Sequence, residues 1–309
     1  MTAKCIESKK KSFAAPIKAL ICIILFIASI CFGSALKEGV IYGFKICFMN
    51  IIPTLFPFFI LSDLWSAYIS FPPDSRLFGL LKPLGIDYNS LDAFLIGNVC
   101  GFPLGAKILT AKYNSGIIGK EELTSLIPLC TNPSLAFVVS GIGAGLLGSI
   151  KVGFLLYFST IISSVLIYLA FPHKSENAEK SAFKSEQSFS LVDSIKNAGI
   201  SCITISSFII FFSAIIGLAK FLIKNEIILS IVSAFFEVGS ACSIISEHSG
   251  LLDIFYLPLI AFSLSFSGIS VFLQVLSVTP SDLSKRRYLS RKLLQGILSA
   301  GITFLILQI

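Results

Sequence analysis

The chain has 309 residues, of which 55% are hydrophobic and only 13% are charged. Its mean hydropathy is +0.89. A soluble core of this length does not need so much apolar surface, so the composition excludes an ordinary soluble protein. It predicts an all-α polytopic membrane protein that lies in the lipid bilayer of a cell membrane.

The net charge of +7 does not indicate a nucleic-acid partner. The basic residues gather in two places outside the apolar runs, which is the pattern of charged membrane flanks. Regions rich in Lys and Arg stay in the cytoplasm, so both places are predicted to be cytoplasmic, and the N-terminus with them. They are Lys4, Lys9, Lys10, Lys11 and Lys18 near the start, and Lys285, Arg286, Arg287, Arg291 and Lys292 near the end.

Nine apolar stretches are long enough to cross or re-enter a membrane. The first follows a basic tail, as in a signal peptide. No small-residue cleavage site precedes a hydrophilic domain, however, so we expect a first transmembrane helix there. The stretches occupy about 17–36, 40–70, 91–111, 123–149, 151–171, 194–223, 227–246, 252–278 and 290–309.

One hydrophilic segment, residues 172–190, interrupts these stretches and is rich in Lys, Glu and Ser. This composition predicts a flexible surface linker between a first membrane repeat, residues 1–171, and a second, residues 191–309. Three segments of the first half correspond in order to three of the second: 43–65 to 194–217, 97–107 to 237–244, and 131–140 to 265–274. The match is one of order and chemistry and not of identity, so chance similarity between apolar segments remains the alternative to a true repeat.

The segment 97–107 reads GNVCGFPLGAK and does not suit a continuous helix in lipid. Its three glycines and Pro103 weaken helical structure, and Asn98 and Lys107 are costly in hydrocarbon. Irregular backbone at membrane depth is tolerated where protein or trapped water satisfies the freed amide and carbonyl groups. The segment therefore predicts a broken helix that lines a polar cavity on a solute path.

Two charged residues are candidates for such a cavity. Glu237 lies in an apolar run, where a carboxylate is costly unless it is protonated, paired or hydrated, and its alternative is a loop or interface position. Lys107 ends the glycine-rich segment, and its alternative is a lysine whose ammonium group reaches the lipid headgroups. If both side chains are interior, a cation and a carboxylate face one cavity.

Two clusters of polar residues interrupt apolar runs elsewhere. Pro133 removes a helical hydrogen bond, so its neighbours can offer carbonyl groups and side chains to a solute. In the second cluster, residues 265–270, small residues permit a tight bend, and Gln274 follows with a donor and an acceptor. The alternative for the cluster around Pro133 is an ordinary turn between two helices. The alternative for residues 265–270 is that the serines only allow helices to pack closely.

We expect the segments 97–107, 131–134, 237–241 and 265–274 to converge on one central cavity. The predicted substrate-binding residues are Asn98, Gly101, Pro103, Lys107, Thr131, Asn132, Ser134, Glu237, Ser267, Gly268 and Gln274.

No motif indicates an enzyme, a cofactor or a metal site. Gly143, Gly145 and Gly148 spell GxGxxG, but they lie in an apolar run without a preceding strand, which favours helix packing over dinucleotide binding. The two histidines form no ligand pair, and the eight cysteines lack CxxC spacing and are interpreted as packing residues. We predict no catalytic residue, cofactor or metal ion.

Several segments resemble those of a known family. They are FPFFILSDLW, GNVCGFPLGAK, KYNSGIIGKEEL, TNPSLAF and SFSGISVFLQV. Together they are similar to the sporulation integral membrane proteins of the Gate-domain (nucleoside-recognition) family of endospore-forming bacteria. The resemblance covers nearly the whole chain, and the first half matches better than the second.

The resemblance implies an architecture similar to that of concentrative nucleoside transporters, with helical hairpins and interrupted helices. It also implies transport of dipicolinic acid, a small anionic solute, across the mother-cell-derived outer forespore membrane during endospore formation. Helix N-termini, backbone amides in a glycine-rich break and Lys107 suit such an anion. Glu237 suits it only if the carboxyl group is protonated or couples a proton or a sodium ion.

Two other functions stay open at this point. One is a nucleoside-type transporter, and the other is a structural membrane protein of spore formation that transports nothing. The loops are short and leave little room for a soluble interaction domain, which favours transport. The sequence does not indicate the coupling ion, the direction of transport or the oligomeric state.

Overall fold

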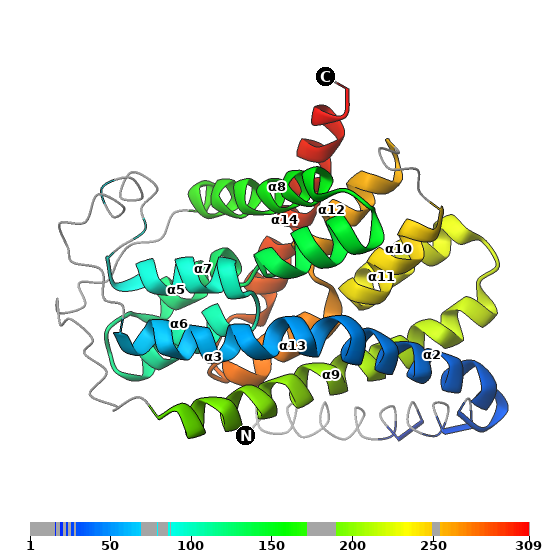
Figure 1. The fold of residues 1–309 in the computed structure, drawn as a ribbon, viewed down its shortest axis with the longest axis horizontal. Helices are drawn as coiled ribbons and strands as arrows, with labels where there is room; N and C mark the ends of the chain where they lie inside the picture. Colours follow the sequence, from blue (N-terminus) through cyan, green and yellow to red (C-terminus); the bar gives the residue numbers. More distant parts are fainter. Residues whose placement is uncertain are drawn as a thin grey trace, which may run out of the picture.

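The computed structural model describes residues 29–68, 88–171, 190–248 and 254–308, with isolated positions at 16, 19, 20, 23, 26, 27, 79 and 86. These residues form helices and connecting turns, and no strand occurs among them (Figure 1). Of the predicted first transmembrane helix, 17–36, the structure describes residues 29–36 and a few isolated positions before them. The linker, apart from residue 190, and the lysines of the N-terminal tail lie outside the described residues.

The chain up to residue 171 forms a series of long and short helices. In order they are α2 (Gly33–Ile46), η1 (Cys47–Ile51), α3 (Ile52–Tyr68), η3 (Tyr88–Ser90), α5 (Leu91–Cys100), α6 (Leu104–Asn114), α7 (Lys120–Cys130), η4 (Phe137–Leu146) and α8 (Ile150–Ala170). Here η1 and η4 are π-helical turns and η3 is a short 3₁₀-helix. A π-helical segment adds one residue to a turn and is often found at functional positions.

The chain after residue 190 begins with the longest helix of the described part, α9 (Leu191–Leu222), which has 32 residues. Five helices follow it: α10 (Glu226–Phe236), α11 (Val238–His248), α12 (Tyr256–Phe266), α13 (Gly268–Val278) and α14 (Lys285–Ile306). The pairs α10/α11 and α12/α13 are each separated by a single residue, which lies between two stretches of regular helix.

Four described helical segments are long and apolar enough to cross a membrane. They are α8, α9, α14 and the pair α12/α13 taken as Tyr256–Val278. A fifth is added if Gly33–Ile51 and Leu55–Leu61, which are bent by 46°, count as one span. These lengths match the thickness of a bilayer, so the described helices are consistent with the helical membrane protein that the composition predicts.

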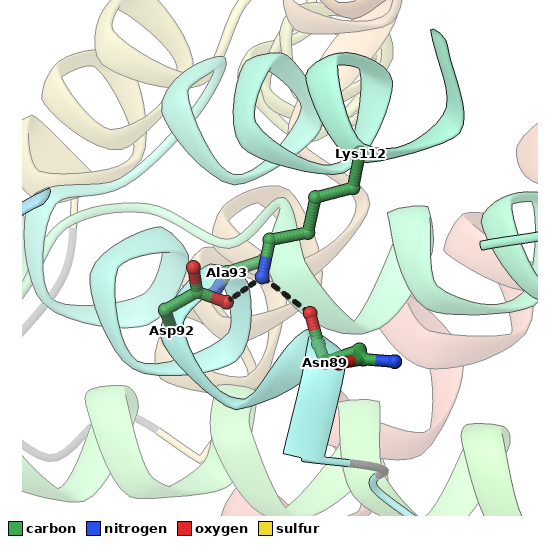
Figure 2. Close-up of polar contacts among 4 residues, drawn as sticks. All are labelled: Asn89, Asp92, Ala93 and Lys112. Carbon is green, nitrogen blue, oxygen red and sulfur yellow. Dashed lines mark hydrogen bonds and ion pairs between the residues drawn. The ribbon is translucent and has the colours of Figure 1, made fainter. Parts of the chain in front are cut away.

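The helices α5 and α6 fold back on each other as an antiparallel hairpin. At its open end, Lys112 of α6 contacts the Asp92 carboxylate in the first turn of α5 and the carbonyl oxygen of Asn89 (Figure 2). Near its tip, a Cβ atom at Gly97 would lie 3.0 Å from the Cα atom of Gly105. The glycines therefore allow the two backbones to approach closely.

The helices α10 and α11 also pack against each other, and Figure 1 shows them side by side, away from α5 and α6. Beneath them in this view, α2 and α9 pack along much of their length. A Cβ atom at Gly217 would lie 2.8 Å from the Cα atom of Gly39. The two glycines therefore allow α2 and α9 to pack closely where they cross. The α9 surface then contributes Ile205 and Ile209 to the interior.

Candidate functional site

The tip of the α5/α6 hairpin contacts the break between α7 and η4. Gly101 has φ = 85°, a conformation that glycine adopts without strain. A Cβ atom there would lie 2.6 Å from the backbone nitrogen of Ser134. The backbone N–H of Phe102 donates to the carbonyl oxygen of Asn132 at 3.0 Å. This hydrogen bond gives a partner to one backbone N–H group of the hairpin tip and to one carbonyl group of the α7/η4 break.

A second contact of this kind joins the break between α12 and α13 to the junction of α10 and α11. Ser267 and Gly268 have φ = 70° and 75°, which turns the chain sharply between the two helices. A Cβ atom at Gly268 would lie 2.9 Å from the carbonyl oxygen of Phe236 and 3.1 Å from the nitrogen of Glu237. Any larger residue at position 268 would force these two breaks apart.

Residues from all four interrupted segments line one cavity of about 30 Å³, although Ser267 and Gly268 at the α12/α13 break itself do not. Gly101 and Phe102 line it from the first hairpin, Ser134 from the α7/η4 break, Glu237 from the second hairpin, and Gln274 from α13. Apolar side chains of η1, α3 and α9 complete the wall. Because a water molecule needs roughly 10–15 Å³ of such space, the cavity has room for about two waters.

The Glu237 carboxylate has a clear structural partner, the N-terminus of α11. It is 1% exposed, and its two oxygens accept from the backbone N–H groups of Gly239 at 2.8 Å and Ser240 at 2.5 Å. A helix N-terminus carries partial positive charge and unsatisfied N–H groups, so it stabilises a buried carboxylate without a cation. The burial of Glu237 is therefore explained by capping, although the residue also lines the cavity.

Gln274 presents an acceptor without a partner in the described part of the structure. Its side chain is 2% exposed, and its Nε2 donates to the hydroxyl of Ser270 at 3.2 Å. Its Oε1 is buried and accepts no hydrogen bond. With the Glu237 carboxylate, it makes the α10–α13 side of the cavity rich in hydrogen-bond acceptors.

Lys107 does not face the cavity, because the structure places it on the exposed side of α6. Gly105 packs against Cys130 and Ala106 is fully buried. Successive residues of an α-helix are rotated by about 100° around its axis. Lys107 therefore points away from the contact between Gly105 and Cys130. Of the two positions considered for Lys107, in the cavity or exposed at the outside of the helix, the structure shows the exposed one. No lysine or arginine lines the cavity.

Lys292 is the buried lysine instead, and its assignment to the basic surface cluster was wrong. It is 2% exposed, and its Nζ donates to the Thr131 carbonyl at 3.0 Å, to Asn132 Oδ1 at 3.2 Å and to Gln295 Oε1 at 3.1 Å. A signal for this existed in the sequence. Polar residues recur along α14 at helical spacing and all are buried: Tyr288, Lys292, Gln295, Ser299 and Thr303.

Asn98, Thr131 and Asn132 lie in a polar network behind the cavity wall. Asn132 Nδ2 donates to Asn98 Oδ1 at 2.8 Å, and Gln295 Nε2 donates to Asn132 Oδ1 at 2.7 Å. The Tyr157 hydroxyl donates to the Asn98 carbonyl at 3.0 Å. This network ties α5, α7, α8 and α14 to the same break, which fixes one wall of the cavity.

The remaining predicted residues lie at the breaks. Ser267 and Gly268 are buried where α12 meets α13, and they support the cavity from behind. Pro103 is half-buried at the hairpin tip, at the start of α6. Over the described residues, no group of three or more His, Cys, Asp or Glu is placed to hold a metal ion.

Comparison with protein-family models, with curated proteins and with solved structures finds no match for this chain. The described residues form apolar helices that are long enough to cross a membrane, and residues of four interrupted helical segments line a small cavity between them.

Proposed function

We propose that this chain is a membrane transporter of a small solute, and that the solute path runs past the four breaks. The observation that carries the proposal is one cavity that residues from all four interrupted segments line. Interrupted helices at membrane depth leave backbone groups without partners, which is favourable only where they line a polar path or are held by protein. Secondary transporters place their binding sites between such segments.

The order of elements supports an architecture of two repeats. A hairpin, a broken pair and a long helix follow one another as α5/α6, α7/η4 and α8, and again as α10/α11, α12/α13 and α14. In each half the hairpin contacts the break that follows it, through Gly101 and Ser134 in the first and through Phe236 and Gly268 in the second. This parallel supports the resemblance to the Gate-domain family and to concentrative nucleoside transporters.

Dipicolinic acid is the first candidate solute, because of the resemblance to sporulation membrane proteins. On this proposal the chain moves the anion across the outer forespore membrane of an endospore-forming bacterium, with a proton or a sodium ion as the coupling ion. The buried Lys292 next to the α7/η4 break supports an anionic solute.

A nucleoside is the second candidate, and the lining of the cavity favours it. Glu237 and the free Oε1 of Gln274 accept hydrogen bonds, whereas no cationic side chain contributes to the wall. Ribose hydroxyls and the N–H groups of bases are donors that suit these acceptors.

The test is uptake into vesicles that contain the purified protein. Radiolabelled dipicolinate and uridine are compared in the presence of an inward proton gradient, a sodium gradient or neither, with protein-free vesicles as the baseline. We expect saturable, protein-dependent uptake of one solute under one gradient. Lys107→Gln, on the exposed side of α6, is the matched control and should keep the wild-type rate.

A second variant connects transport to the breaks. Gly101→Val should abolish uptake, because its Cβ would lie 2.6 Å from the Ser134 nitrogen. Its helix content and its yield in the membrane must match those of the wild type for this result to count. If neither solute enters protein-containing vesicles faster than protein-free ones under any gradient, the chain is not a transporter of these solutes, and a structural role replaces the proposal.

A further inference from the structure

Lys292 is a buried lysine that has no acidic partner in the described part of the structure. Its three hydrogen bonds all go to neutral oxygens, those of Thr131, Asn132 and Gln295. No described carboxylate lies within ion-pair distance of it. It belongs to α14, which is apolar and long enough to cross a membrane. A buried ammonium group at such a position is costly, and intramembrane charges usually serve a function.

Lys292 is connected to the cavity by two hydrogen bonds. Its Nζ donates to the Asn132 side chain, and the Asn132 carbonyl accepts from the Phe102 backbone at 3.0 Å. Phe102 lines the cavity, as does Ser134, two residues after Asn132. The Lys292 ammonium group thus contacts the segment 131–134, which contributes Ser134 to the lining of the cavity.

Hydrogen bonding alone does not require a lysine at this position. The carbonyl of Thr131 and the side-chain oxygen of Asn132 would accept equally from a neutral amide. The end of α7 carries some negative partial charge, which favours a cation, but such a charge is worth little compared with the cost of burial. An anion in the adjacent cavity would supply the missing counter-charge, and a low-dielectric interior would strengthen that attraction.

We propose that Lys292 is a specificity-determining residue, which makes the cavity select a solute that carries a carboxylate. It acts through the 131–134 segment and is therefore a positioning residue. Glu237 also lines the cavity and, when ionised, repels a carboxylate, so the solute carboxylate lies next to Ser134 at the α7/η4 break. The inference rests on the proposed transport function for its substrate class. It assigns to Lys292 the role that the sequence predicted for Lys107.

The experiment measures binding and transport separately on the full-length protein. Binding is the rise in unfolding temperature of the detergent-purified protein with dipicolinate, with isophthalate, which keeps both carboxylates but lacks the ring nitrogen, and with uridine as an uncharged probe. Transport is the KM and maximal rate of uptake into vesicles. The variants are Lys292→Gln, Lys292→Met and Lys292→Arg, with Lys107→Gln as the matched control.

We expect both dicarboxylates to raise the unfolding temperature of the wild type and of Lys107→Gln. For Lys292→Gln and Lys292→Met, the concentration of dicarboxylate needed should rise by about tenfold to a hundredfold, the usual effect of removing one charged partner. Lys292→Arg keeps the charge and should restore most of the binding. The KM of uptake should follow the same order, while the maximal rate and any response to uridine stay unchanged.

Three results would overturn the inference. One is a wild-type protein whose unfolding temperature does not respond to either dicarboxylate, which decides the matter even if the neutral variants do not fold. Another is a neutral variant that binds dicarboxylates as tightly as the wild type does. The third is an equal loss of the responses to dicarboxylates and uridine without rescue by Lys292→Arg. Binding that depends on Lys292 without uptake would instead refute transport and leave the anion site standing.

Discussion

Single residues in this protein combine a structural task with a place at the cavity, and Glu237 is the clearest case. It lines the cavity, yet both of its carboxylate oxygens accept from backbone N–H groups at the start of α11. It also has extended backbone, with φ = −151° and ψ = 125°, between α10 and α11. The hairpin tip is therefore held by the same side chain that faces the cavity.

Glu237→Ala should destabilise the fold more than Glu237→Gln does. Alanine leaves the Gly239 and Ser240 N–H groups buried without an acceptor, at a cost of about 1–3 kcal/mol for each group. Glutamine keeps one acceptor oxygen and loses the charge, so its loss should be about half as large. Thermal unfolding in detergent, followed by circular dichroism, measures both. Equal stability of wild type and Glu237→Ala would show that the cap contributes nothing.

At the scale of elements, the α5/α6 hairpin depends on contacts at both ends. Its tip docks on the α7/η4 break, and its open end is closed by Lys112, which is 5% exposed and contacts Asp92 and the Asn89 carbonyl (Figure 2). Both lysines of the segment 107–112 lie on α6, but only Lys112 is buried. Its charge is paired, so its role in the structure is to hold the two helices together.

Lys112→Met should loosen the hairpin while Lys107→Met should not. Removing Lys112 leaves Asp92, whose side chain is 36% exposed, without its cation, and such a partly hydrated pair contributes about 1 kcal/mol. Adding Asp92→Asn to Lys112→Met should cost less than the sum of the two single changes, because both remove the same contact. Thermal unfolding of the wild type, Lys112→Met, Asp92→Asn and the double variant gives the interaction energy between the two side chains. Additive losses would mean that the pair does not couple the two helices.

At the scale of the whole molecule, one end of the bundle collects basic residues from separate helices. Lys120 at the start of α7 pairs with Asp282 at 3.1 Å, and Arg287 of α14 pairs with Glu121 at 2.5 Å. The guanidinium group of Arg291 lies 5.4 Å from the ring of Phe171, which follows α8. The starts of α7 and α14 and the end of α8 are therefore on the same side of the membrane.

The positive-inside rule predicts that this side is cytoplasmic. In a background without native cysteines, Arg286→Cys should be labelled by a membrane-impermeant thiol reagent only from the cytoplasmic side. Ile150→Cys, at the other end of α8 and 57% exposed, should react only from the opposite side. Lys9→Cys tests whether the N-terminal tail shares the side of Arg286. Labelling of positions 150 and 286 from the same side would contradict the arrangement of the bundle.

Local properties of the sequence were sufficient to predict the class of the fold and the location of the breaks. The composition predicts a membrane protein, and apolar stretches as long as a transmembrane helix predict that it is helical. Gly101 and Gly268 mark the breaks because each has a positive φ that a glycine adopts without strain. The meeting of the breaks at one cavity also agrees with what their polar residues indicate.

Only the tertiary structure decided which charges are interior. Lys107 and Lys292 both adjoin apolar residues, and Lys292 stands beside exposed basic residues in the sequence. Burial depends on how each helix is rotated against its neighbours. The polar residues at helical spacing along α14 indicate that Lys292 shares a face with them, but not which helices this face packs against. The contacts of α6 with α7 turn Lys107 outward, while the packing of α14 on α7 and α8 turns Lys292 inward to Thr131 and Asn132. Lys292 therefore replaces Lys107 as the candidate lysine of the site.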